Sequence, residues 1–224
     1  MIKICFLCSG NGGNLRFINK CIQKKIIPNI ELVGIIADRH CEAITFAQYN
    51  NLSAYKINYS RKNNAELKEA LISLNPDIIV TNFHKILDEE IVNLFKGKLI
   101  NLHYSLLPAF GGVIGDKPVR MALDTGCKFV GTTVHFVDEE VDNGFIISQN
   151  LLPVANNSEF QVIMNEVFRM GCVNLLNAIL HISNQEISIE NNLSNIYGYE
   201  RNEIVSSPPF NHSMIFNEDF WRSI

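Results

Sequence analysis

Short apolar runs alternate with helical segments through the first hundred residues of the chain. The runs are rich in Ile, Val and Leu, and each is followed by glycine or polar residues. A strand buried on both faces reads as a continuous apolar run, and strands that alternate with helices form parallel β-α-β units. The sequence therefore predicts an α/β fold with a mostly parallel sheet and helices on both faces. The predicted strands cover residues 2–8, 30–37, 53–57, 76–81 and 99–103, and the predicted helices cover residues 15–25, 41–50, 63–74 and 88–95.

The pattern changes after residue 108. A glycine-rich loop precedes a short helix, and two strands are followed by a long amphipathic helix. The Asn- and Ser-rich tail ends in an aromatic cluster, which we expect to cover the core or a neighbouring subunit, so a homodimer is one of the assemblies considered. No internal repeat and no linker divides the chain. These segments are the loop 109–117, the helix 118–125, the strands 129–136 and 145–153, the helix 159–182 and the tail 184–224.

Composition excludes two classes of partner. The chain has 224 residues, 47% of them hydrophobic, which is enough for a sizeable core. Its formal net charge is -4, whereas a protein that neutralises nucleic-acid phosphates needs a basic face. No apolar run approaches the roughly 18 residues that a membrane span requires. We therefore expect small-molecule substrates, no nucleic acid and no membrane.

The six cysteines indicate a reduced environment. Cys5 and Cys8 have the C-x-x-C spacing, but on a strand they point to opposite faces. Buried thiols are therefore favoured over a redox pair or a metal site. The N-terminal residues lack the basic start and the long apolar stretch of a signal peptide. Both observations predict a cytoplasmic protein.

The sequence SGNGGN at residues 9–14 lies between the first predicted strand and the first predicted helix. Glycines let a backbone approach a ligand closely, and the free N–H groups of a first helical turn bind anions. The alternative is a tight turn without a ligand. Leu15 stands where a dinucleotide fingerprint has its third glycine, although Asp38 could mimic the ribose-binding acid. The loop thus favours a phosphate monoester over a dinucleotide.

Asn101 and His103 lie at the end of a predicted strand, where alternate residues share a face. An amide and an imidazole side by side can stabilise an oxyanion and move a proton. Ligands of open α/β sheets bind outside the carboxyl ends of the strands, which is where this pair falls. The alternative is a polar pair that only stabilises the strand end. His135, in a later strand, is interpreted as a core histidine.

Four carboxylates crowd residues 138–142, just after the strand that carries His135. A carboxylate close to His103 would favour the imidazolium and raise the pKa of the histidine. The acids lack the spacing of an EF-hand, and no second ligand cluster accompanies them. We expect a solvated loop and no metal.

In this order, the motifs resemble the folate-dependent formyltransferases. The resemblance rests on SGNGGNL at 9–15, NLHYSLLP at 101–108, and HFV at 135–137 running into VDNG at 141–144. It covers roughly residues 1–155 and implies a Rossmann-like formyltransferase fold. The chain is then a single domain over 1–224. Within it we distinguish a nucleotide- or phosphate-binding half (1–108), a folate-side half (109–183) and a C-terminal extension (184–224).

The resemblance implies a one-carbon group transferase whose co-substrate is 10-formyltetrahydrofolate. An amine of the acceptor would attack the formyl carbon, and Asn101 with protonated His103 would hydrogen-bond the oxyanion. Asp142 would hold the imidazolium and a water through which protons move. General acid–base help of this kind is worth roughly 10²–10⁴ in rate.

The family also implies the binding residues. The backbone of Gly12, Gly13 and Asn14 would cradle the phosphate of the acceptor. The segment 83–87 matches the family's wall of the pterin pocket, and Arg61 falls near a folate-contacting arginine. The residues expected to contact the folate are Arg61, His84, Lys85, Ile86, Leu87, Asn101, Asp138 and Val141.

The acceptor is the least constrained part of the prediction. The glycine loop favours the branch of the family that formylates glycinamide ribonucleotide in purine biosynthesis. Gly13, Tyr104, the long loop 110–117 and Met170, which falls about where the family has a ribonucleotide-contacting acid, depart from that branch. These departures keep open an amino sugar nucleotide as the acceptor. A non-catalytic Rossmann-like protein that binds a nucleotide or folate is a third hypothesis.

Overall fold

The computed structural model describes residues 1–154, 159–184, 205–207 and 218–224, which form two compact units. The first unit comprises Met1–Leu102, His135–Phe145 and Ile224, and the second comprises His103–Val134 and Ile146–Ser223. The segment 135–145 thus belongs to the first unit although it lies beyond residue 108. The proposed division at residues 108 and 183 stays a prediction.

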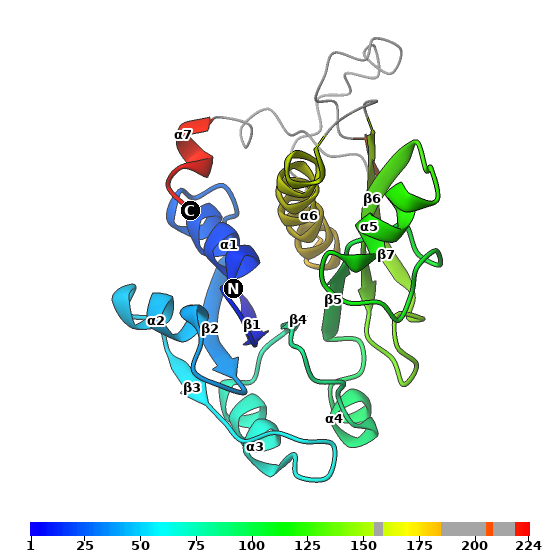
Figure 1. Cartoon of the computed structure of the whole chain (residues 1–224). Coiled ribbons are helices and arrows are strands. Elements are labelled where there is room, and N and C mark those ends of the chain that lie inside the picture. Colours follow the sequence, from blue (N-terminus) through cyan, green and yellow to red (C-terminus); the bar gives the residue numbers. More distant parts are fainter. Residues whose placement is uncertain (155–158, 185–204, 208–217) are drawn as a thin grey trace. The chain divides into compact units, whose positions relative to one another are not determined.

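The first unit contains a parallel sheet in the order β3-β2-β1-β4-β5 (Figure 1). The chain runs outward from β1 to β3 on one side and then returns to β4 and β5 on the other. This reversal creates a topological switch point between β1 and β4, where open α/β sheets bind ligands. The predicted Rossmann-like parallel sheet is confirmed. The strands are β1 (Ile2–Cys8), β2 (Ile30–Ala37), β3 (Ala54–Lys56), β4 (Ile78–Asn82) and β5 (Leu99–His103).

Helices cover both faces of this sheet, as predicted. Cys5 and Leu7 of β1 belong to a core cluster that also holds Leu67 of α3 and Ile91 of α4; we call it the α3–α4 cluster. Phe6 faces the opposite side and is equally buried, so that face is covered too. The helices of this unit are α1 (Gly13–Gln23), α2 (Glu42–Tyr49), α3 (Ala65–Leu74) and α4 (Glu89–Leu94).

The second unit packs a long helix, α6 (Phe160–Ile182), against β7 (Ile146–Pro153). Asn174 of α6 joins them, because its side-chain amide donates to the carbonyl oxygens of Thr132 and Ser148. Trp221, near the end of the tail, is buried and lies beneath the guanidinium of Arg169 on α6, 5.2 Å from the ring centroid. The predicted aromatic cluster thus covers the core at Trp221, whereas Phe216 lies outside the described residues. The other elements are α5 (Lys117–Asp124), β6 (Phe129–Phe136), β8 (Val205–Ser207) and α7 (Glu218–Trp221).

All six cysteines are free thiols. Cys5 and Cys8 are buried in β1, so the prediction of buried thiols is confirmed. Burial, with a smaller effect from Cys41, raises the pKa of Cys8 to about 12. None of the described helices has the length and apolar character needed to cross a membrane.

Candidate active site

Three polar side chains of the first unit meet at the end of β5. The amide nitrogen Nδ2 of Asn101 lies 3.3 Å from Nε2 of His135 and 3.4 Å from Oδ1 of Asp142. The imidazole nitrogen and the carboxylate oxygen are 3.5 Å apart. The side chains of His135 and Asp142 are 2% and 7% exposed, so these polar groups satisfy each other away from bulk water. The structure therefore brings together two of the three predicted catalytic residues, Asn101 and Asp142.

The neighbours of the cluster determine which of its nitrogen atoms carry hydrogen and donate. Nδ1 of His135 lies 2.8 Å from the carbonyl oxygen of Phe136, so Nδ1 carries the proton. In the neutral ring, Nε2 is then an acceptor for the Asn101 amide. A flipped amide would place its oxygen against the Asp142 carboxylate, which is unfavourable. Asn101 thus donates to both neighbours, and its oxygen lies 3.2 Å from the hydroxyl of Thr81, which can donate to it.

The loop after β6 carries Asp142 in a constrained conformation. The N–H of Val137 donates to the carbonyl of Leu99 at 2.9 Å, which ties the loop to β5. A side chain at Gly144 would collide with the carbonyl oxygen of Phe136, so only glycine fits there. Asp142 itself has a φ of 56°, in the left-handed region that costs most residues energy but that Asp and Asn tolerate best. This strain is of the kind that clusters at functional sites.

His103, the third predicted catalytic residue, ends β5 and belongs to the second unit. It is buried, and its Nε2 lies 3.1 Å from the carbonyl oxygen of Phe110, so this nitrogen carries a proton. Thr133 holds the segment that follows: its hydroxyl donates to the carbonyl of Ser105 at 2.7 Å and accepts the N–H of Leu107 at 3.0 Å. The S-L-L-P segment at residues 105–108 is therefore held by Thr133. The Nε2 side of the His103 ring faces the backbone of the loop that follows this segment.

The predicted phosphate loop opens α1. Gly12 has a φ of 70°, and a Cβ there would lie 2.9 Å from the Cβ of Ala43, so glycine is required twice over. Gly13 is the first helical residue, and Asn14 is buried in the first turn. Any contact of Asn14 with an anion would therefore use its backbone N–H, as predicted for the loop.

Most of the predicted folate residues fall into two segments with a common anchor. Phe83 and Val137 both pack against the α3–α4 cluster, so the segments 83–87 and 137–142 start from the same part of the first unit. His84, Lys85, Ile86, Asp138 and Val141 are exposed, whereas Leu87 is buried in the cluster and offers only backbone. Arg61 is exposed at the tip of a turn between β3 and α3.

The structure fits the family's acceptor site less well than its catalytic residues. Met170 is fully buried in the core cluster of the second unit, together with Val119, Val130 and Ile163. It therefore offers no polar group at the position where the family resemblance placed an acid. Among the described residues, no three His, Cys, Asp or Glu side chains are grouped to hold a metal ion.

An open parallel sheet with an amide, an imidazole and a carboxylate at its strand ends is typical of α/β enzymes that act on small molecules. The sequence profile of the formyl transferase family matches residues 2–179. The chain belongs to the formyl transferase family, which confirms the resemblance read from the motifs.

Individual relatives agree with this assignment. The chain is similar to phosphoribosylglycinamide formyltransferase of Haemophilus influenzae, with 34% identity over 162 residues that cover 69% of this chain and 74% of that protein. It is 28% identical to the chloroplastic phosphoribosylglycinamide formyltransferase of Vigna unguiculata over 69% of this chain, but spans only 52% of that protein. Among solved structures, glycinamide ribonucleotide transformylase 1 from Symbiobacterium toebii has a TM-score of 0.75 and 29% identity, and the match covers 85% of this chain and 92% of that one.

Sequence reasoning missed the role of His135. It was interpreted as a core histidine, and it is indeed buried, but its ring contacts both Asn101 and Asp142. The available signal was its position seven residues before Asp142, at the start of the loop that returns to β5. Thr81, which orients the Asn101 amide, gave no signal, because it reads as an ordinary strand residue.

Proposed function

We propose that this chain transfers a formyl group from 10-formyltetrahydrofolate to the primary amine of glycinamide ribonucleotide, a step of purine biosynthesis. The observation that carries the proposal is the closed polar cluster in which the Asn101 amide donates to both His135 and Asp142. Such a donor, half-buried and oriented in advance, suits an oxygen that gains negative charge. Relatives named for this activity support it.

The co-substrate supplies the formyl carbon when it is bound. Asn101 then exchanges its two long hydrogen bonds, of 3.3 and 3.4 Å, for one to the formyl oxygen. Protonated His103 acts as the second donor to that oxygen. Asp142 relays the proton that the attacking amine loses, through a water, to N10 of the tetrahydrofolate, which leaves as the bond between N10 and the formyl carbon breaks. The fixed φ of Asp142 and the Thr81 contact hold these groups before the substrate arrives, which is the source of the rate advantage.

The remaining predicted residues are assigned to binding. Gly12, Gly13 and Asn14 hold the acceptor's phosphate through their backbone. Val141, Asp138, Arg61 and the segment 83–87 hold the folate. The apolar side chains of Ile86 and Val141, 56% and 52% exposed, fit a flat ring such as a pterin. A cytoplasmic location is part of the proposal and is supported by the six free thiols.

An amino sugar nucleotide is the second candidate acceptor. It is favoured by Met170, which is buried where an acid would recognise a ribonucleotide, and by the long glycine-rich loop at 110–117. A third outcome is transfer to water, because the chain is also 29% identical over 141 residues to formyltetrahydrofolate deformylase of Haemophilus influenzae.

The test is a three-way assay of tetrahydrofolate release, with glycinamide ribonucleotide, with a panel of amino sugar nucleotides, and with no acceptor. We expect release to depend on glycinamide ribonucleotide and Asp142→Asn to lower kcat by roughly 10²–10⁴. Release that requires an amino sugar nucleotide overturns the proposed acceptor, and equal release without any acceptor overturns transfer to an amine. If no tetrahydrofolate is released in any of the three arms, the chain is not a formyl-transferring enzyme and the proposal fails.

A further inference from the structure

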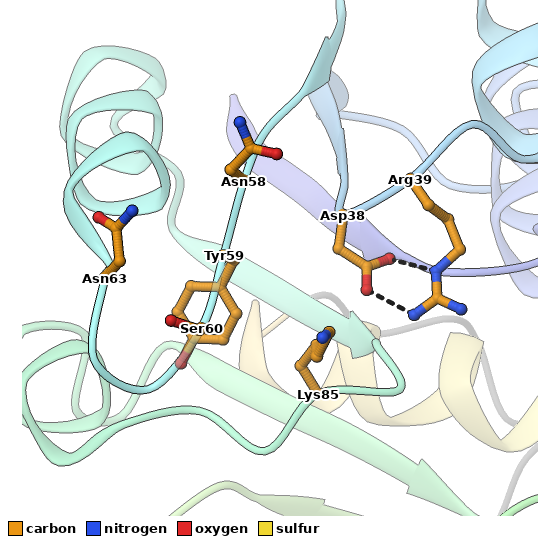
Figure 2. A pocket seen from close by; sticks show the side chains of 7 residues that line it. All are labelled: Asp38, Arg39, Asn58, Tyr59, Ser60, Asn63 and Lys85. Atoms are coloured by element: carbon orange, nitrogen blue, oxygen red, sulfur yellow. Dashed lines mark hydrogen bonds and ion pairs between the residues drawn. The ribbon is translucent and has the colours of Figure 1, made fainter.

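The proposed acceptor carries a ribose between its phosphate and its amine, and the hydroxyl groups of this ribose need polar partners. The sequence had suggested Asp38 for that role. Both carboxylate oxygens of Asp38, however, accept hydrogen bonds from Arg39, at 3.0 and 2.7 Å (Figure 2). The Asp38 side chain is only 2% exposed. Asp38 is thus fully used in holding Arg39, and it cannot bind a ribose.

The surroundings of this pair point away from the acceptor as well. Asp38 and Arg39 line a cavity of about 420 Å³ together with Lys85 and the loop between β3 and α3 (Figure 2). Lys85 belongs to the segment proposed for the folate, whereas residues 9–14 of the phosphate loop do not line this cavity. Met170, the other position considered, offers no polar group. The ribose therefore needs a polar partner elsewhere.

The order of the strands indicates where the ribose lies. In the parallel sheet β4 lies between β1 and β5. The phosphate loop follows β1, and Asn101, the proposed donor to the formyl oxygen, lies near the end of β5. Neighbouring strands are about 4.8 Å apart, so a molecule that reaches from the loop to Asn101 spans roughly 10 Å and crosses the end of β4. The last residue of β4 is Asn82.

The side chain of Asn82 lies on the face of the sheet that α1 covers. Ile79 belongs to the α3–α4 cluster, so Asn82, three residues later on the same strand, points to the opposite face. The helices α1 and α3 lead the chain in opposite directions along the sheet, and right-handed connections therefore place them on opposite faces. The carbonyl oxygen of Asn82 also accepts the N–H of Ser9 at 3.2 Å. Asn82 is thus adjacent to the phosphate loop, on the side of the helix that this loop opens.

The fold itself makes no use of the Asn82 amide. Its Oδ1 is closed to solvent, and within the part of the chain that the structure describes the side chain makes no hydrogen bond. The neighbouring Thr81, by contrast, donates to the carbonyl of Ile100 and to the side chain of Asn101. Folded proteins leave few buried polar groups unpaired, because each of them lowers stability. Since no protein partner orients this amide, a rotation can present either its oxygen or its nitrogen, which suits a hydroxyl group that both donates and accepts.

We propose that Asn82 hydrogen-bonds a ribose hydroxyl of the acceptor and provides the ribose recognition that neither Asp38 nor Met170 can supply. The inference rests on the proposed function, because it takes glycinamide ribonucleotide as the acceptor. The ribose lies away from the reacting carbon, so this contact is equally strong in the bound substrate and in the transition state. Its loss therefore raises KM and leaves kcat unchanged.

The contact is isolated by a glycinamide 2′,3′-dideoxyribonucleotide, which lacks both ribose hydroxyl groups. The wild-type chain should bind it roughly tenfold more weakly than glycinamide ribonucleotide, the upper range for a hydrogen bond between neutral groups. In Asn82→Ala the two ligands should bind with affinities within about twofold of each other. With glycinamide ribonucleotide, this variant should show a KM raised roughly tenfold and a kcat within about twofold of wild type.

The test combines two measurements on the full chain. Calorimetric titration with each ligand, in the absence of any folate, measures binding apart from catalysis, and steady-state assays separate KM from kcat. Asn82→Leu removes the amide but keeps the size of the side chain, so agreement with Asn82→Ala excludes an effect of the lost volume. Asn50→Ala is the matched control, because the Asn50 amide donates to the carbonyl of Phe46 at 2.9 Å. It should keep the wild-type ratio of the two affinities.

The outcomes separate this inference from the proposed function. Equal affinity of the wild-type chain for the two ligands overturns the inference, and so does a ratio that both Asn82 variants leave unchanged, even if the chain formylates glycinamide ribonucleotide. A lowered kcat at an unchanged KM overturns the binding role as well. A ratio that depends on Asn82, in a chain that releases no tetrahydrofolate, supports the inference and overturns the proposed function. If glycinamide ribonucleotide does not bind to the wild-type chain, both fail.

Discussion

Replacing Asn101 by Asp tests the cluster at its centre. The variant keeps the shape of the side chain but puts a carboxylate oxygen where the amide donated to Asp142 at 3.4 Å. Two unit charges at that distance repel each other by about 5 kcal/mol at an effective dielectric constant of 20. A deficit of that size is a large part of the stability of an ordinary domain. We therefore expect the unfolding midpoint in urea to drop strongly at pH 8.

The loss of folding stability in the Asn101→Asp variant should depend on pH with a definite sign. One proton taken up by either carboxyl group relieves the repulsion, so the carboxyl pair has a raised pKa in the folded variant. The unfolded chain lacks this interaction and binds fewer protons in that pH range. Stability relative to wild type is therefore recovered as the pH falls and lost as it rises, by up to about 1.4 kcal/mol per pH unit. Urea titrations of the variant and of the wild type at several pH values between 5 and 8.5 measure this difference in stability.

The double variant Asn101→Asp, Asp142→Asn is the control. It restores one carboxylate and one amide, and Asn tolerates the φ of 56° at position 142 as well as Asp does. Stability should return to within about 1 kcal/mol of wild type, while activity stays at least about 10²-fold reduced, because the donor at position 101 is gone. A deficit that is independent of pH, or that the second substitution does not repair, would show that the two side chains do not face each other.

Three further predictions follow from particular contacts. Gly12→Ala should cost about 2–4 kcal/mol of stability in urea unfolding, from its φ of 70° and its contact with Ala43, whereas Gly10→Ala, with open space around it, should cost under about 1 kcal/mol; equal costs would refute the reasoning. Tyr59→Phe should cost about 1–2 kcal/mol at pH 7. Burial raises the pKa of Asp88, but hydrogen bonds from Asn64 and Tyr59 lower it below its usual value, so this cost should shrink as the pH falls below about 4; a cost constant down to pH 3 would contradict this role. A thiol reagent should modify two cysteines quickly in the native protein and the buried four only after unfolding, and rapid modification of all six would contradict the burial. The two accessible thiols are those of Cys41 and Cys127.

The fold was predictable because its strongest signals are local. Continuous apolar runs such as residues 2–8 and 30–37 are typical of central strands, and the structure has strands over those same ranges. The burial of Cys5 and Cys8 in β1 followed from the same argument. Residue ranges alone did not reveal that the segment 135–145 returns to the first unit, because this return rests on long-range contacts, such as the backbone hydrogen bond between Val137 and Leu99 and the contact of Asp142 with Asn101.

The candidate site was predictable only in part. Asn101 and His103 stood out because two polar groups two residues apart interrupt an apolar strand end. Asp142 could not be separated from its neighbouring acids by spacing; its φ of 56° and its contact with Asn101 distinguish it in the structure. The sequence also suggested Asp38 as a ribose ligand, but it could not show that the next residue, Arg39, would occupy both carboxylate oxygens.

Ser9 fixes the positions of the ligand-binding loops of the first unit relative to one another. This buried residue directly follows β1, and its hydroxyl accepts the N–H of His84 from the loop after β4. The same hydroxyl also donates to Asp38, which follows β2 and holds Arg39. One side chain at the switch point thus links the loop proposed for the acceptor's phosphate to the segment proposed for the folate and to the cavity beside it. Because a transfer between two bound molecules requires their reacting atoms to meet within a fraction of an ångström, such a shared anchor places both binding surfaces on one rigid support.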